Sequence, residues 1–305
     1  MKIAVLGAGA MGSIYGGHLS LHNEVYMIDK KADIVEKINA DGLKLFENDT
    51  DVTYRPKALL SSEGLGEADL VILFVKSLFS EAALEENSHI IGKNTYVMTL
   101  QNGAGHEDIL AKFVPMERII IGTTEDNGAI LDNAYVRRGG MGKTNIGMLV
   151  NDTEGMLGKV KESFDACGFD THIYGNIQQL IWDKLFTNVS LSALTGVLQV
   201  PMGYIAADSY AWEMAVTLIK EAVAVAEAMG LDFDEERIIE RVRQTSEGSP
   251  EGRTSIYTDL SLGRKTEVNT ISGAVVRAGE KMGIPVPSHR MIVNMVHAME
   301  DKSRH

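Results

Sequence analysis

The glycine-rich stretch from Gly7 to Gly12 constrains the fold of this 305-residue chain more than any other feature. It follows the apolar run Ile3–Leu6 and leads into a stretch of helical character at Met11–Ser20. In such a unit the first glycine permits a tight turn, the second lets backbone amides approach a pyrophosphate, and the third allows helix and strand to pack closely. The helix N-terminus adds partial positive charge. We therefore predict a dinucleotide site formed by Gly7, Ala8, Gly9, Ala10, Met11 and Gly12.

The first half of the chain alternates short apolar runs with polar stretches of helical character. The predicted strands are Lys2–Leu6, Glu24–Ile28, Leu70–Lys76, Thr95–Leu100 and Arg118–Gly122. They lack polar alternation, which is typical of a parallel sheet covered by helices on both faces. This pattern predicts a doubly wound α/β domain. The glycine-rich residues 135–147 predict a hairpin at the far edge of the sheet, followed by a helix at 153–167 and a short strand at 170–174.

From about residue 178 onward, helical patterns replace the strands. They run through Gln178–Leu198, Ser209–Met229, Glu235–Thr245, Thr266–Met282 and His289–Lys302. Glycine and proline residues near 230 and 283–287 act as stop signals between them. We expect a dinucleotide-binding domain over residues 1–176 and a helical domain for substrate binding and dimerisation over residues 177–305.

Charge and cysteine content exclude several classes of function. Lys and Arg total 29 against 42 Asp and Glu, which gives a formal net charge of −13. An acidic surface repels phosphate backbones and anionic lipid, so we expect no nucleic-acid partner and no membrane partner. No apolar run approaches the roughly 18 residues that span a bilayer. The single cysteine, Cys167, cannot form an internal disulfide, and the histidines show no close metal-binding pair. We expect a cytoplasmic protein without a metal.

Asp29 and Lys30 give opposite indications about which dinucleotide is bound. A carboxylate that ends the second strand normally accepts hydrogen bonds from the ribose hydroxyls of NAD, and it would repel a 2′-phosphate. Lys30 and Lys31 follow directly, and either ammonium could meet that phosphate. The residues alone leave NAD(H) and NADP(H) open.

Two polar residues come at the ends of predicted strands. Lys76 ends the stretch Leu70–Lys76, and Asn102 follows the stretch Thr95–Leu100. Ligands of open α/β sheets lie outside the carboxyl ends of the strands, so both side chains are expected to face the nicotinamide end of the cofactor. A surface position is the alternative for a single lysine, and the pairing with Asn102 favours the site.

A polar stripe crosses an otherwise apolar helical stretch in the second half. Lys184, Asn188 and Ser192 recur every four residues, which places them on one face of a helix. A lysine among apolar neighbours suits a general acid, although a helix with one solvated edge is the alternative. Further along, Ser255 can donate to a carboxylate. Glu267 is predicted to open a helix, where it could simply complement the helix dipole.

These features together resemble the ketopantoate reductase (2-dehydropantoate 2-reductase) family over essentially the whole chain. The resemblance rests on GAGAMG at 7–12, Lys76, QNG at 101–103, W-x-K-L-x-x-N at 182–188, T-S-x-x-x-D at 254–259 and G-R-x-T-E at 263–267. It implies a Rossmann-type domain followed by an all-helical domain. It also implies reduction of 2-dehydropantoate to pantoate, a step of pantothenate biosynthesis, with NADP(H).

The same resemblance implies residue roles. Lys184 would protonate the carbonyl oxygen as hydride is delivered, and Lys76 would lie near the cofactor. The 2-oxo acid and its hydroxyl would be held by Asn102, Asn188, Ser192, Ser255 and Glu267. Family members often carry Asn-x-x-x-Asn where this chain has Asn188-Val-Ser-Leu-Ser192, so the contact from residue 192 departs from the family pattern.

Three other functions are compatible with parts of the sequence. The first is an NADH-dependent reductase of another branched or aromatic 2-oxo acid. The second is a dehydrogenase of the glycerol-3-phosphate or opine type, which would need a strongly basic phosphate pocket or a metal-like His/Asp set that the sequence does not show. The third is a dinucleotide-sensing protein without turnover, which would not require Lys184 and Glu267 together.

Overall fold

The computed structural model describes residues 1–302 and divides them into two compact units. Unit 1 comprises residues 1–101 and 106–177, and unit 2 comprises residues 102–105 and the chain from 178 onward. The short segment Asn102–Gly105 therefore belongs with the helical unit although the chain around it belongs to unit 1.

Unit 1 is built on an eight-stranded sheet with the strand order β12-β11-β8-β7-β6-β1-β2-β5. The strands are β1 (Lys2–Leu6), β2 (Glu24–Ile28), β5 (Lys57–Leu59), β6 (Leu70–Leu73), β7 (Tyr96–Thr99), β8 (Ile119–Thr124), β11 (Lys143–Gly147) and β12 (Asp170–Ile173). All neighbours are parallel except β8 and β11. The four residues of β6 and of β7 are all buried, as expected for strands with helices on both faces.

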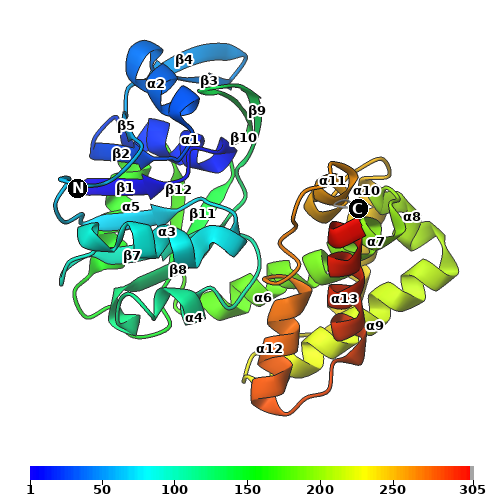
Figure 1. Cartoon of the computed structure of the whole chain (residues 1–305). Coiled ribbons are helices and arrows are strands. Elements are labelled where there is room, and N and C mark those ends of the chain that lie inside the picture. The colour runs from blue at the N-terminus through cyan, green and yellow to red at the C-terminus, as the bar shows by residue number, and fades with distance from the viewer. Residues whose placement is uncertain (303–305) are drawn as a thin grey trace. The chain divides into compact units, whose positions relative to one another are not determined.

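Five α-helices and three short 3₁₀ turns accompany this sheet (Figure 1). The helices are α1 (Ala10–Leu19), α2 (Ala32–Asp41), α3 (Ser80–Glu86), α4 (Glu107–Leu110) and α5 (Met156–Ala166). The 3₁₀ turns cover Ser77–Phe79, Ser88–Ile90 and Met116–Arg118. The core includes Tyr15 of α1, whose ring stacks on Phe169 with centroids 4.4 Å apart. The predicted Rossmann-type domain is confirmed.

A second sheet in unit 1 was not predicted. It has four strands in the order β4-β3-β10-β9, which are β3 (Leu43–Glu47), β4 (Thr50–Tyr54), β9 (Asn127–Asp132) and β10 (Tyr135–Gly140). The predicted hairpin over residues 135–147 is therefore wrong, because β10 pairs with β3 and β9 whereas β11 pairs with β8 and β12. The glycine run at 139–142 carries the chain from one sheet to the other.

Unit 2 is helical, and no strand occurs among its described residues. Its helices are α6 (Ile177–Thr187), α7 (Ala193–Leu198), α8 (Met202–Ala207), α9 (Ser209–Ala228), α10 (Glu235–Gly248), α11 (Ser255–Ser261), α12 (Ser272–Met282) and α13 (Pro287–Lys302). A π-helical turn, Asn188–Ser192, joins α6 to α7. Helices α9, α12 and α13 pack on one another. The prediction of an all-helical second part is confirmed.

Within residues 1–302, none of the helices combines the length and the apolar character needed to cross a bilayer. The same residues contain no group of three or more His, Cys, Asp or Glu side chains arranged to hold a metal ion.

Candidate functional site

The glycine loop has the compact geometry that its sequence indicates. Gly7 has a φ of +102°, which favours glycine, and its N–H donates to the carbonyl of Ile28 at 2.8 Å. A Cβ on Gly12 would lie 1.9 Å from the carbonyl oxygen of Gly7, so only glycine allows α1 to start this close to the loop. A Cβ on Gly9 would meet nothing within 4 Å. The loop is therefore closed at Gly7 and Gly12 and open at Gly9.

The N-terminus of α1 suits an anion. Gly9 is its N-cap and offers no side-chain acceptor, and the first turn contains no acidic residue. The first N–H groups of a helix have no partner within the helix, and the dipole places partial positive charge there. With open space at Gly9, this arrangement fits the pyrophosphate of a dinucleotide.

Asp29 binds the glycine loop itself. Its Oδ2 accepts a hydrogen bond from the Ala8 N–H at 2.7 Å, and its Oδ1 accepts one from the Lys31 N–H at 3.0 Å. The carboxylate is expected to fix the loop relative to the end of β2. Each carboxylate oxygen has further acceptor capacity, so a ribose hydroxyl can still be bound. Lys30 is exposed, and its Nζ lies 2.7 Å from Glu86 Oε1 of α3.

A buried polar network holds the C-terminal half of α1, and the sequence did not reveal it. His18 Nε2 lies 2.8 Å from Glu47 Oε2 of β3, and the Tyr54 hydroxyl donates to Glu47 Oε1 at 2.6 Å. Arg138 of β10 pairs with Asp126 at 2.9 Å. Burial alone would raise the pKa of Glu47, but the hydrogen bonds from His18 and Tyr54 lower it. The second sheet thus anchors the helix that carries the glycine loop.

The two predicted strand-end residues lie beyond their strands. β6 ends at Leu73, and Lys76 follows it as the N-cap of a 3₁₀ turn. β7 ends at Thr99, and the exposed Asn102 belongs to unit 2. Gln101, just before Asn102, donates through Nε2 to the Val75 carbonyl at 2.6 Å. This side chain, which the sequence analysis left without a role, ties together the two segments that follow β6 and β7.

The predicted polar stripe lies on a continuous helical run that contains a π-helical turn. Lys184 is on α6, and Asn188 and Ser192 are the first and last residues of the turn. Lys184 and Asn188 are half-buried, whereas Ser192 is 4% exposed and its Oγ has no hydrogen-bond partner in residues 1–302. A π-helical turn is wider than an α-helical one, so the simple four-residue spacing no longer holds at Ser192. Such turns are frequent at functional sites.

Ser255 begins a short helix, and Glu267 lies in a different local structure from the one predicted. Ser255 is the exposed first residue of α11, which Thr254 caps through a hydrogen bond from the Tyr257 N–H. The prediction that Glu267 opens a helix is wrong, because α12 begins only at Ser272. Glu267 is half-buried in an irregular segment, and its carbonyl accepts the Thr270 N–H at 3.0 Å. Glu267 therefore does not lie in the first turn of a helix, so it cannot complement a helix dipole there.

Unit 2 brings Asn102 and Glu267 onto adjoining segments. The Ala104 N–H donates to the Thr270 carbonyl at 2.8 Å. Gly103 has a φ of +100°, and a Cβ there would lie 2.1 Å from the Thr270 oxygen, which explains the glycine in the Gln-Asn-Gly motif. This backbone hydrogen bond thus joins the segments that carry Asn102 and Glu267, two of the predicted substrate-binding residues.

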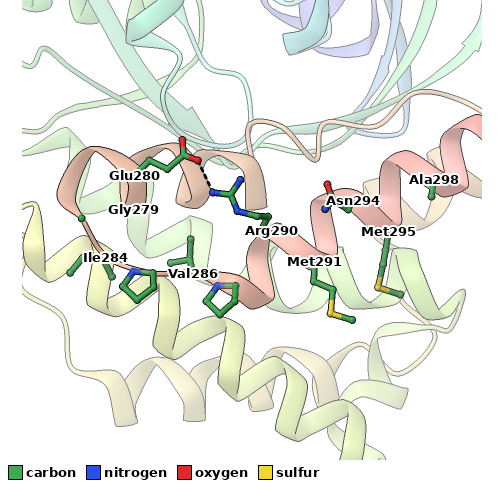
Figure 2. A pocket seen from close by; sticks show the side chains of 12 residues that line it. Gly279, Glu280, Ile284, Val286, Arg290, Met291, Asn294, Met295 and Ala298 are labelled. Atoms are coloured by element: carbon green, nitrogen blue, oxygen red, sulfur yellow. Dashed lines mark hydrogen bonds and ion pairs between the residues drawn. The ribbon is translucent and has the colours of Figure 1, made fainter.

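A separate apolar groove of about 860 Å³ lies on unit 2. Figure 2 shows Met291 and Met295 of α13 along it and an ion pair between Arg290 and Glu280 of α12, whose atoms are 2.6 Å apart. None of the predicted site residues lines this groove.

Comparisons with known proteins match both parts of the chain to one family. Residues 3–151 match the family described as ketopantoate reductase PanE/ApbA, and residues 176–300 match the family described as its C-terminal part. The chain belongs to the ketopantoate reductase family. It is accordingly an NAD(P)-dependent oxidoreductase acting on CH–OH groups, and its glycine loop and Lys184 occur in the two matched regions.

Individual similar proteins align with nearly the full length of the chain. The chain is 30% identical to a 2-dehydropantoate 2-reductase of Streptococcus pyogenes over 302 residues, which cover 98% of each chain. It is 32% identical to one of Pyrococcus horikoshii, again over 98% of each. Among solved structures, a D-mandelate dehydrogenase with NADH and anilino(oxo)acetate is 34% identical, with a TM-score of 0.90 over 100% of this chain and 99% of that one.

Proposed function

We propose that this chain reduces 2-dehydropantoate to pantoate, with NADPH as the preferred donor and Lys184 as the general acid. The observation that carries the proposal is the family match over both units, with full-length relatives that are named 2-dehydropantoate 2-reductase. The open glycine loop and the acid-free N-terminus of α1 support dinucleotide binding in unit 1. Lys30 is the proposed partner of the 2′-phosphate.

The dinucleotide supplies a hydride to the C2 carbonyl carbon of the 2-oxo acid when it is bound. Lys184 donates a proton from Nζ to the carbonyl oxygen, so the C=O π bond becomes one C–H and one O–H bond. The ammonium also stabilises negative charge that develops on this oxygen, and proton transfer of this kind typically contributes about 10²–10⁴-fold. Solvent returns the proton to Lys184.

The remaining residues are proposed to bind the substrate. Asn102, Asn188 and Glu267 would hold the polar groups of the 2-oxo acid, and the exposed hydroxyl of Ser255 would donate to its carboxylate. Ser192 has a buried hydroxyl without a partner in the described chain, so it can donate to the side-chain hydroxyl of 2-dehydropantoate. Lys76 is proposed to contact the cofactor.

Two observations favour a second candidate, the NADH-dependent reduction of an aromatic 2-oxo acid. The D-mandelate dehydrogenase that is 34% identical was solved with NADH. Asp29 is positioned at the end of β2, as expected for a residue that reads a ribose hydroxyl. This candidate uses the same loop and the same Lys184, and it differs in the substrate side chain and the dinucleotide.

Oxidation of NADPH and of NADH by the purified chain separates the candidates. The panel contains 2-dehydropantoate, 2-oxoisovalerate and phenylglyoxylate, each with both dinucleotides. We expect the highest kcat/KM with 2-dehydropantoate and NADPH. A higher value with phenylglyoxylate and NADH would favour the second candidate, and no oxidation with any pair would overturn both.

The expected homodimer and the cytoplasmic location stay predictions. The mass of the chain in solution, measured by light scattering after size-exclusion chromatography, tests the first. Fractionation of the cells that produce the protein tests the second.

A further inference from the structure

Glu300 is a buried carboxylate far along the chain from every predicted site residue. It lies in the last turn of α13, and its side chain is 1% exposed. Oε1 accepts hydrogen bonds from the Thr266 N–H at 2.7 Å and the Thr266 hydroxyl at 2.8 Å. Oε2 lies 3.0 Å from Lys265 Nζ and 3.0 Å from His297 Nδ1. Both carboxylate oxygens are therefore engaged.

Local helix physics does not explain this residue. A negative charge in the last turn of a helix is opposed by the helix dipole, and a buried carboxylate is costly unless it is paired. Burial would raise the pKa of Glu300, but the hydrogen bonds from Thr266, His297 and Lys265 outweigh it and lower the pKa to about 2. The surroundings of Glu300 are thus arranged to keep it charged.

The segment that Glu300 binds has no regular structure of its own. It connects α11 to α12 and contains Glu267, the residue next to Thr266. The Thr266 hydroxyl also accepts the Val268 N–H at 3.2 Å, and His297 Nε2 lies 3.1 Å from Asn269 Oδ1. Two residues of α13, one turn apart, therefore hold both sides of Glu267.

The segment between α11 and α12 also supports Asn102, the other proposed substrate-binding residue. Thr270 accepts the Ala104 N–H through its carbonyl, and Gly103 packs against that carbonyl. A continuous series of contacts within unit 2 therefore runs from Glu300 through Thr266 and Thr270 to the segment that carries Asn102.

We propose that Glu300 is a positioning residue for substrate binding, which fixes Glu267 and the Asn102–Gly105 segment through its two hydrogen bonds with Thr266. This role rests on the proposed function, in which Glu267 and Asn102 contact the 2-oxo acid. Glu300 itself contacts no reacting atom. Its loss should weaken the handling of the 2-oxo acid and change dinucleotide binding little, because the proposed pyrophosphate and ribose contacts are in unit 1.

The test compares Glu300→Ala with Glu300→Gln. Alanine removes the oxygen, Oε1, that accepts both hydrogen bonds from Thr266, whereas the amide oxygen of glutamine can still accept them. We expect Glu300→Ala to lower kcat/KM for the 2-oxo acid by about 10- to 100-fold, because small displacements of substrate-binding groups have effects of this size. Glu300→Gln should recover most of the loss. The Kd of the dinucleotide should stay within about twofold of the parental value in both.

A matched control separates positioning from a general loss of stability. Val296→Ala removes a fully buried side chain one turn earlier on α13 and leaves Thr266 untouched. It should lower Tm while kcat/KM stays parental at a temperature where the variant is folded. Hydrogen exchange should quicken at residues 102–105 and 266–270 in Glu300→Ala and stay parental there in Val296→Ala.

The failures of the two proposals can be told apart. A parental chain that reduces no 2-oxo acid overturns the proposed function and this role with it. An active parental chain with unchanged kcat/KM in Glu300→Ala overturns the positioning role alone. Equal losses in Glu300→Ala and Val296→Ala would also overturn it, since they would reflect stability.

Discussion

The glycine loop of unit 1 and the segment before α12 in unit 2 are both irregular, and a carboxylate from elsewhere holds each one. Asp29 accepts the Ala8 N–H at 2.7 Å, and Glu300 accepts the Thr266 N–H at 2.7 Å. The partners are 21 residues apart in the first case and 34 in the second. Asp29 is half-exposed and near the expected ligand, whereas Glu300 is buried.

This difference concerns what each carboxylate can do. Asp29 can fix its loop and still contact a ribose, so a change there affects loop geometry and ligand binding together. Glu300 can act only through the segment that it holds. In the proposed function, the dinucleotide half of the reaction therefore depends on a short, local motif, and the 2-oxo acid half depends on long-range packing within unit 2.

The largest expected effect is a loss of turnover at Lys184 that leaves dinucleotide binding unchanged. Lys184→Ala should reduce kcat by about 10²–10⁴-fold, because the proton donor and the charge at the carbonyl oxygen are lost. The Kd of the dinucleotide, measured by calorimetry, should stay parental. Lys220→Ala is the matched control, since this exposed lysine of α9 pairs only weakly, at 3.6 Å, with Glu235. Parental kcat in Lys184→Ala would remove the lysine from the mechanism.

A substitution at Gly9 is expected to weaken dinucleotide binding without lowering the stability of the chain. A Cβ there meets nothing within 4 Å, so Gly9→Ala should keep the parental Tm. It would occupy space at the N-terminus of α1, and overpacking of about 1–3 kcal/mol should weaken dinucleotide binding by roughly 5- to 150-fold. Gly158→Ala on α5 is the control, because its Cβ is equally free of contacts. Unchanged dinucleotide affinity in Gly9→Ala would place the pyrophosphate elsewhere.

The charge of Glu300 predicts a pH dependence of stability. Its pKa is about 2 in the folded chain against an ordinary value of 4.5, so its stabilisation is complete above 4.5 and is lost as the pH falls towards 2. The difference in unfolding free energy between the parent and Glu300→Gln should therefore shrink by about 3 kcal/mol over this window. Urea unfolding across the window measures it. A difference that stays constant across this window would contradict the assignment.

The sequence predicted the parts of the fold that depend on local pattern. β1 and β2 have the predicted bounds, Lys2–Leu6 and Glu24–Ile28, because each is a short, mostly buried apolar run that starts at a charged residue. The second sheet was missed, although Leu43–Glu47 alternates and Asn48 and Asp49 have positive φ values of 49° and 59° at its turn. That two-residue turn between alternating strands was the available signal.

In the candidate site too, features that depend on local sequence pattern could be predicted and features that depend on the tertiary fold could not. The glycine loop could be predicted because ligand approach itself dictates the spacing of the glycines. The π-helical turn at Asn188–Ser192 could not, since no local residue pattern distinguishes it from the α-helix around it. Glu300 also gave no signal, because a glutamate on a polar C-terminal helix is typical of a solvated surface. Only the tertiary fold brings it to Thr266.

The smallest expected effect is a change in the KM for NADPH when Lys30, the residue after Asp29, is replaced. Lys30 is exposed and pairs with Glu86, so a phosphate contact from it would be solvent-screened and worth about 1 kcal/mol. Lys30→Ala should raise the KM for NADPH by about fivefold and leave that for NADH unchanged. Glu86→Gln should do the opposite, because it releases Lys30 from a competing carboxylate. Lys37→Ala, which breaks a similar exposed pair with Asp41 on α2, is the control. If both Lys30→Ala and Glu86→Gln keep the parental ratio of the two KM values, Lys30 does not read the phosphate. Asp29, through its hold on Ala8, would then be the residue of this strand end that matters for the cofactor.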